Sequence, residues 1–142
     1  MTPEDIGAFN AQLIEQFRAS GGVGKLGPVD FAHLAVVTTR GRRTGEPRTV
    51  PIGYARDADG HPLLFASGNA SPRDPEWYRN IEADPHVHIE ITGTEWDADA
   101  EVLSGADRED AYRRWIEMAP NVADHEEKSG RRIPLVRVRK PS

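Results

Sequence analysis

Roughly six short segments of this chain have strand patterns, and few helices separate them, which restricts the folds that the chain can adopt. The clearest two, residues 86–92 and 95–103, alternate between apolar and polar side chains on either side of the turn Gly93-Thr94. Such alternation is typical of strands that have one face in a core and the other in water. The remaining predicted strands are 33–39, 49–56, 61–67 and 133–139. We therefore predict a mainly β (α+β) protein, built as a small antiparallel barrel with peripheral helices.

Three further segments have helix patterns. Residues 3–20 follow a capping Thr2 and carry an apolar stripe, which consists of Ile6, Phe9, Leu13, Ile14 and Phe17. A short helix is expected to begin after an N-cap at Asp74 and to end near Glu82, and a third helix covers residues 106–118. We expect the stripe of the first helix to pack on the core; the alternative is a peripheral membrane contact.

Residues 22–27, Gly-Val-Gly-Lys-Leu-Gly, match the dinucleotide-binding fingerprint G-x-G-x-x-G. The fingerprint requires a strand before it and a helix after it. Here a predicted helix precedes the segment and Pro28 follows it, so we interpret the segment as a connector. The chain is then one domain, 1–142, in which residues 1–30 hold the first helix and the connector, and residues 31–142 hold the barrel with its helices.

The composition excludes several kinds of function. The 142 residues include no cysteine, so a disulfide, a thiolate nucleophile and a cysteine-bound zinc are excluded. The formal net charge of −5 argues against a nucleic-acid partner, because nucleic-acid binding needs a basic surface. No apolar run approaches the ~20 residues of a membrane span. The N-terminus also lacks a signal-peptide pattern, which favours a cytoplasmic protein.

The segment 40–48 is the strongest candidate for a binding site, because it gathers positive charge on an acidic protein. Its sequence, Arg-Gly-Arg-Arg-Thr-Gly-Glu-Pro-Arg, contains four arginines and one glutamate between two predicted strands. Arginine side chains match phosphate oxygens with paired hydrogen bonds, and turn N–H groups can complete an anion site. The pattern predicts an anion-binding hairpin; the alternative is a charged hairpin that is only solvated.

Two later segments could complete a pocket. Residues 65–70 leave a strand through small side chains that let a ligand approach the backbone, and Ser67 adds a hydroxyl. Residues 75–80 begin a helix, and a helix start favours anions. Trp77 and Tyr78 in this helix could form the wall of a site for a flat ring; the alternative is that both belong to the core.

No catalytic group can be recognised in the sequence. His86 and His88 lie on one face of a predicted strand, as metal ligands can, but the sequence shows no third ligand beside them, and we predict no metal site. A hydrolase would need a nucleophile or a metal, and the chain has neither a G-x-S-x-G elbow nor a P-loop. The catalytic residues are therefore unknown at this point.

Taken in order, the candidate segments resemble a known family. They run from Thr38-Thr39-x-Gly41-Arg42-Arg43-Thr44-Gly45-x-Pro47-Arg48 through Ala66-Ser67 and Pro75-x-Trp77-Tyr78-x-Asn80 to Asp84-Pro85, and Arg132-Ile133-Pro134 follows near the C-terminus. This ordered set is similar to the deazaflavin-dependent nitroreductase family, and the resemblance extends over residues 9–138.

The resemblance implies a split β-barrel related to the FMN-binding and pyridoxamine-oxidase barrels. It also implies a site for coenzyme F420, a deazaflavin with a phosphate and an acidic tail. The residues that it places at the cofactor are Arg42, Arg43, Arg48, Thr49, Pro51, Ala66, Ser67, Gly68, Asn69, Trp77, Tyr78 and Asn80. Of these, the arginines would line the phosphate and the tail, residues 49 and 51 the ring, residues 67–69 the opposing loop, and the last three the pocket wall.

The implied activity is that of an F420-dependent oxidoreductase, which transfers a hydride from the reduced deazaflavin to a small electron-poor acceptor. We expect quinones or enones before nitroaromatics, because residues 119–125 contain none of the tyrosines that family nitroreductases carry there. The alternatives are a split-barrel reductase that uses FMN and a non-catalytic protein that binds a cofactor or a lipid. Related barrels often dimerise, so a homodimer is a further expectation.

Overall fold

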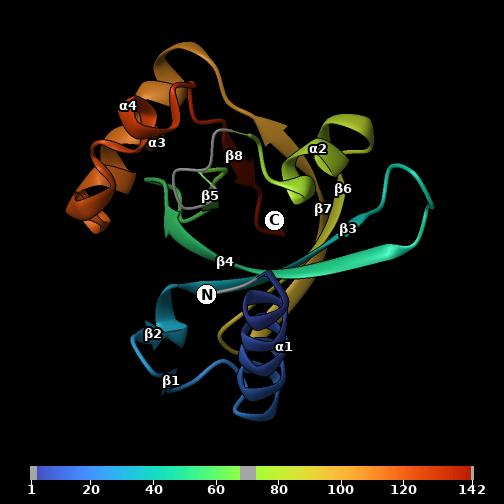
Figure 1. Ribbon diagram of the computed structural model, residues 1–142. Coiled ribbons are helices and arrows are strands. Elements are labelled where there is room, and N and C mark those ends of the chain that lie inside the picture. The colour runs from blue at the N-terminus through green and yellow to red at the C-terminus, as the bar shows by residue number, and fades with distance from the viewer. Residues whose placement is uncertain (1–2, 68–72, 142) are drawn as a thin grey trace.

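The structure is a computed structural model that describes residues 3–67 and 73–141 (Figure 1). Within these residues, six antiparallel strands close a barrel in the order β3-β4-β5-β8-β7-β6. The strands are β3 (Leu34–Arg40), β4 (Pro47–Arg56), β5 (Pro62–Phe65), β6 (His86–Ile91), β7 (Thr94–Val102) and β8 (Leu135–Val138). The predicted mainly β barrel with peripheral helices is confirmed, and each predicted strand corresponds to one strand of the barrel.

Strand β4 is long enough to pair with two different strands along its length. Residues 47–53 pair with β3, and residues 54–56 pair with β5. The β3–β4 hairpin extends beyond the barrel and ends in the turn 41–46, beside helix α2 (Glu76–Ala83) (Figure 1). The long strand therefore connects the arginine-rich turn directly to the barrel core.

The inward faces of the strands form the main core. The apolar residues of β6 are buried as predicted, with exposed fractions of 0–4% for Val87, Ile89 and Ile91. On β7, Trp96 and Ala100 join the same core. The alternation predicts Val102 on this face as well, but it is the last residue of β7 and is 49% exposed. The next residue, Leu103, is buried instead on the outer face of the barrel under helix α3.

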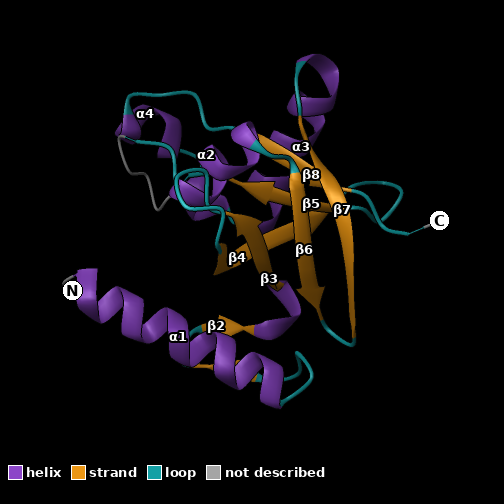
Figure 2. Cartoon of the chain, turned by 90° about the vertical axis from the view of Figure 1, so that its right-hand side faces the viewer, coloured by secondary structure: helices purple, strands orange, loops and turns teal. Residues whose placement is uncertain are grey.

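Helix α1 (Pro3–Ala19) lies against the outer face of the barrel, and Figure 2 shows it beside the strands. A small separate core holds it there and includes Leu13, Phe17, Phe31, Leu34 and Val36. Arg18 adds an ion pair to Glu90 of β6, with Nη2 and Oε2 2.8 Å apart. The expected packing of the apolar stripe is confirmed for Leu13 and Phe17, whereas the side chain of Ile6 lies outside the described part.

The glycine-rich segment after α1 is more than a plain connector. Strand β1 (Lys25–Leu26) pairs with β2 (Val29–Asp30), and the short helix η1 (Phe31–His33) follows. Gly22 has a φ of +79°, and a Cβ there would lie 2.8 Å from Thr92 Cα, so no side chain fits. Strand β1 lies inside the fingerprint-like segment rather than before it, which agrees with our rejection of dinucleotide binding.

Helices α3 (Gly105–Met118) and α4 (His125–Ser129), joined by η2 (Pro120–Val122), cover the outer face of β5 and β8 (Figure 1). Trp115 of α3 stacks on Phe65, with ring centroids 4.9 Å apart. The helix pattern of residues 106–118 places Met118 on the same inward side as Ala111 and Trp115, but Met118 ends the helix and is 36% exposed. Within residues 3–67 and 73–141, we find no helix with the length and apolar character needed to cross a membrane.

Candidate functional site

The arginine-rich turn has a defined backbone conformation. Gly41 N donates to Glu46 O and Gly45 N donates to Gly41 O, each at 2.8 Å. Gly45 has a φ of +76°, which an L-residue rarely adopts. The N–H groups of Arg43 and Thr44 have no acceptor among the described residues. The tip of the turn can therefore offer two backbone donors to an anion.

Arg42 is held in place by the buried Asn80 of α2. Its backbone N and its Nη1 both donate to Asn80 Oδ1, at 3.2 and 3.0 Å. Asn80 Nδ2 in turn donates to Thr39 Oγ1 at 3.1 Å, and the Asn80 residue is only 3% exposed. The amide thus joins the end of β3, the turn and the helix at one point. Arg42 is a fixed part of the site rather than a free cation.

Glu76 also contacts Arg42, and sequence reasoning missed it. Its Oε2 lies 2.7 Å from Arg42 Nη1, although its side chain is 75% exposed. The hydrogen bond from Arg42 holds the pKa of the Glu76 carboxyl below its usual value, with burial opposing and nearby arginines helping. Glu76 is therefore an anion at neutral pH within the arginine cluster.

Arg43 and Arg48 differ from Arg42, because they are exposed and form no ion pair with any residue that the structure describes. Together with the turn and α2 they enclose an open pocket of about 550 Å³. Of the predicted site residues, the pocket brings together Arg42, Arg43, Arg48, Thr49, Trp77 and Asn80. Gly41, Thr44, Pro47, Val50 and Glu76 complete its lining. The pocket therefore combines unpaired positive charge with the apolar surfaces of Val50 and Trp77.

The other predicted site residues that the structure describes do not line this pocket. Ala66 is fully buried in the main core, and Pro51 is half-buried on β4. Tyr78 packs edge-to-face against Trp77 with ring centroids 6.3 Å apart, and burial raises the pKa of its hydroxyl. Ser67 is half-buried and does not line this pocket. Gly68 and Asn69 lie outside the described residues.

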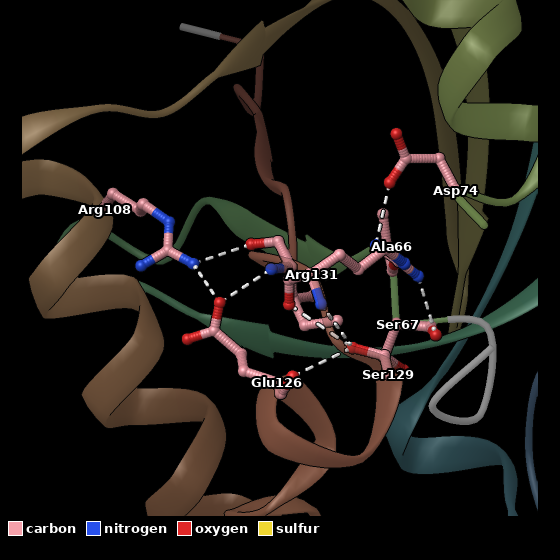
Figure 3. Close-up of polar contacts among 8 residues, drawn as sticks. Ala66, Ser67, Asp74, Arg108, Glu126, Ser129 and Arg131 are labelled. Atoms are coloured by element: carbon pink, nitrogen blue, oxygen red, sulfur yellow. Dashed lines mark hydrogen bonds and ion pairs between the residues drawn. The ribbon is translucent and has the colours of Figure 1, made fainter. Parts of the chain in front are cut away.

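Arg131 connects the end of β5 to the start of α2 (Figure 3). Its Nη2 donates to the carbonyl oxygens of Ala66 and Ser67, both at 2.9 Å, and its Nη1 lies 2.7 Å from Asp74 Oδ1. We predicted Asp74 as the N-cap of α2, but Pro75 occupies that position without a side-chain cap, and Asp74 pairs with Arg131 instead. The ion pair thus fixes the approach to the helix that carries Trp77 and Asn80.

A second set of polar contacts, which involves Ser129, Glu126 and Arg108, lies beside Arg131 (Figure 3). Ser129 Oγ accepts from Arg131 N and donates to Arg131 O, both at 3.3 Å. Glu126 Oε2 accepts from Ile133 N at 2.7 Å and from Arg108 Nη2 at 3.1 Å. Helices α3 and α4 are therefore joined to Arg131 and to the residues after it by polar contacts as well as by the outer core.

The histidine pair lies on the outer face of the barrel, away from the pocket lining. His88 Nδ1 is 3.0 Å from Asp97 Oδ1, and His86 lies 3.7 Å from both Asp97 and Asp99. The sequence showed no third ligand here because these carboxylates come from β7, the neighbouring strand. The distances are those of hydrogen bonds and loose ion pairs across two strands.

The closed barrel and its arginine-lined pocket define a small barrel protein with a candidate site for an anionic ligand. The family model described as F420H(2)-dependent quinone reductase matches residues 11–141. The chain belongs to this family, and it is an oxidoreductase that uses coenzyme F420. The resemblance to deazaflavin-dependent nitroreductases is confirmed in its broader part, the dependence on F420, whereas the family is named for quinones.

Individual relatives agree with this assignment. The chain is 34% identical over 102 residues to the F420H(2)-dependent quinone reductase Rv1261c of Mycobacterium tuberculosis, which covers 69% of this chain and 67% of that protein. It is similar to a solved F420-H2 dependent reductase (FDR-A), with a TM-score of 0.68 and 30% identity over 75% of this chain and 94% of that one.

Two further structures resemble the fold. One, described as a domain-swapped dimer, has a TM-score of 0.71 and 27% identity, and the match covers 97% of this chain and 100% of that one. The other is a Listeria innocua protein named for pyridoxamine 5'-phosphate oxidase, with a TM-score of 0.54 and 12% identity over 78% of this chain and 85% of that one. The second likeness shows the fold alone, and it confirms the predicted split barrel.

Proposed function

We propose that the arginine-lined pocket holds the phosphate and acidic tail of coenzyme F420, with Arg43 and Arg48 as the principal anchors. The observation that carries this proposal is the pair of exposed arginines without ion-pair partners among the described residues. The unpaired N–H groups of Arg43 and Thr44 add donors for the same anion. This donor set fits a phosphate, and it stands on a protein with a net charge of −5.

The neighbouring groups give this end of the pocket its shape. Arg42 and Asn80 hold the turn against α2, and Trp77 presents an apolar wall beside the arginines. Reduced F420, when bound, supplies the hydride. The residues of the chain bind and orient the cofactor and exclude water. This division of roles agrees with the described pocket lining, which contains no histidine and no tyrosine.

We propose quinones as the preferred acceptors. A quinone needs a hydride and a proton that solvent can supply, so no proton-donating side chain is required. The absence of tyrosine from residues 119–125 supports quinones or enones before nitroaromatics. The reduction of menadione by reduced F420, compared with that of a nitroaromatic at equal concentration, measures this preference. Equal or faster turnover of the nitroaromatic would contradict it.

The Arg43→Ala variant tests whether Arg43 holds the phosphate and tail of the cofactor. We expect the variant to lose about 1–3 kcal/mol of F420 binding free energy, or about 5- to 150-fold in Kd, because a charge-assisted hydrogen bond is lost. The loss should shrink as salt is added. Arg132→Ala is the matched control, since it removes an exposed arginine outside the pocket lining. Wild-type affinity in Arg43→Ala, measured by cofactor fluorescence, would remove this residue from the site.

One experiment separates the proposal from its alternatives. The purified protein is titrated with F420, FMN and heme, and reduced F420 is then supplied with menadione. Binding and oxidation of F420 are expected. Binding of FMN alone would support the flavin-using alternative, and binding without turnover would support a carrier.

We further propose that the enzyme acts in the cytoplasm as a homodimer. The homodimer is supported by the likeness of the chain to the structure described as a domain-swapped dimer.

A further inference from the structure

The arginine cluster already contains one anion of its own. Glu76 Oε2 lies 2.7 Å from Arg42 Nη1, and Glu76 lines the same pocket as Arg42, Arg43 and Arg48. A carboxylate in this position occupies one of the directions in which the Arg42 guanidinium can donate to a ligand. Glu76 therefore occupies a position at Arg42 that an incoming phosphate oxygen or tail carboxylate could otherwise take.

Glu76 is not needed to hold Arg42. The backbone N and Nη1 of Arg42 both donate to Asn80 Oδ1, and this amide is buried and fixed by Thr39. Glu76, by contrast, is the first residue of α2, and its side chain is 75% exposed. An exposed ion pair contributes little stability, so its carboxylate can leave the arginine at small cost.

We propose that Glu76 is an internal competitor of the cofactor, whose carboxylate occupies Arg42 in the free protein and is displaced when an anionic ligand binds. This inference rests on the proposed function, because it concerns the same pocket. A ligand with several negative charges can displace the carboxylate and engage all three arginines, whereas a ligand with a single charge gains little by doing so. Glu76 thus lowers the affinity of the pocket for polyanionic ligands, which need Arg42, more than for singly charged ones.

The test compares Glu76→Gln with Glu82→Gln. Both variants remove one carboxylate from α2, and Glu82 is exposed and outside the pocket lining. Glu76→Gln should bind F420 about two- to fivefold more tightly than wild type at low salt, because the competing ion pair and its repulsion are gone. The gain should vanish at high salt. Glu76→Ala should show the same gain, and Glu82→Gln should match wild type.

Inorganic pyrophosphate and acetate serve as the second and third probes, and calorimetry measures the binding of each. Glu76→Gln should bind pyrophosphate more tightly than wild type and leave the weak binding of acetate unchanged. Wild-type or weaker affinity of Glu76→Gln for both F420 and pyrophosphate would overturn the inference and leave the proposed function standing. If no variant binds F420 but Glu76→Gln still gains affinity for pyrophosphate, the cofactor assignment fails and the competition remains.

Discussion

Replacing Arg131 with methionine is expected to lower the free energy of unfolding by about 3–4 kcal/mol and to weaken F420 binding in the protein that remains folded. The side chain of Arg131 is only 14% exposed, and it satisfies two carbonyl groups and one carboxylate. Removal of Arg131 leaves the part-buried Asp74 carboxylate uncompensated and two carbonyl groups without a donor, and these losses together cost several kcal/mol. Urea unfolding measures the stability, and cofactor fluorescence below the transition measures the binding.

The second readout distinguishes a positioning residue from a merely structural one. Arg131→Lys keeps the charge and can reach Asp74, but a single ammonium cannot bond Asp74 and both carbonyls in the same geometry. We therefore expect it to recover most of the stability and only part of the affinity. Arg132→Ala should change neither quantity, because its side chain is exposed. If folded Arg131→Met binds F420 as tightly as wild type, Arg131 stabilises the fold without shaping the pocket.

Asn80→Leu is expected to cost about 2–3 kcal/mol of stability and most of the cofactor affinity. Leucine has the branched shape of asparagine and as many side-chain heavy atoms, but it leaves the backbone N–H of Arg42 without its acceptor and Thr39 without its amide donor. Each buried group left without a partner costs about 1–3 kcal/mol. The turn then loses its attachment to α2, and the arginines lose their common arrangement. Thermal unfolding and F420 titration follow the two effects.

Asn80→Asp is the matched control for this substitution. A carboxylate still accepts from both Arg42 donors, and the Thr39 hydroxyl can rotate to donate to it. We expect a stability close to that of wild type and an affinity reduced by less than in Asn80→Leu. Equal losses in the two variants would show that the shape of the amide, and not its hydrogen bonds, maintains the site.

The elements of the fold could be predicted because their patterns are local. The alternation in residues 86–92 and 95–103 and the glycine turn between them determine one hairpin, and residues 87, 89 and 91 are buried as predicted. Predictions failed mainly at element ends. Val102 and Met118 follow the correct period, but each ends its element, where no neighbouring element covers the side chain.

The candidate site was predictable only in part, for a different reason. The arginine-rich turn is one continuous segment, and its charge is visible in the sequence. The contacts that organise it join residues far apart in the chain, such as Arg42 with Asn80 and Arg131 with Asp74. No local pattern distinguishes Arg131 from the exposed Arg132 beside it. Only the strand pairing of β5 with β8 brings this part of the chain beside Ala66.

The closure of the barrel also limits how two copies of this protein can associate. Each of the six strands has a hydrogen-bonded neighbour on both sides, but residues 47–53 of β4 and 94–99 of β7 pair on one side only, so among the described residues these stretches carry open backbone edges. Self-association by strand addition would therefore use these stretches or the short β1–β2 pair that follows α1. Contacts through the rest of the barrel have to use side-chain surfaces, which makes such assembly sensitive to surface substitutions that leave the barrel itself intact.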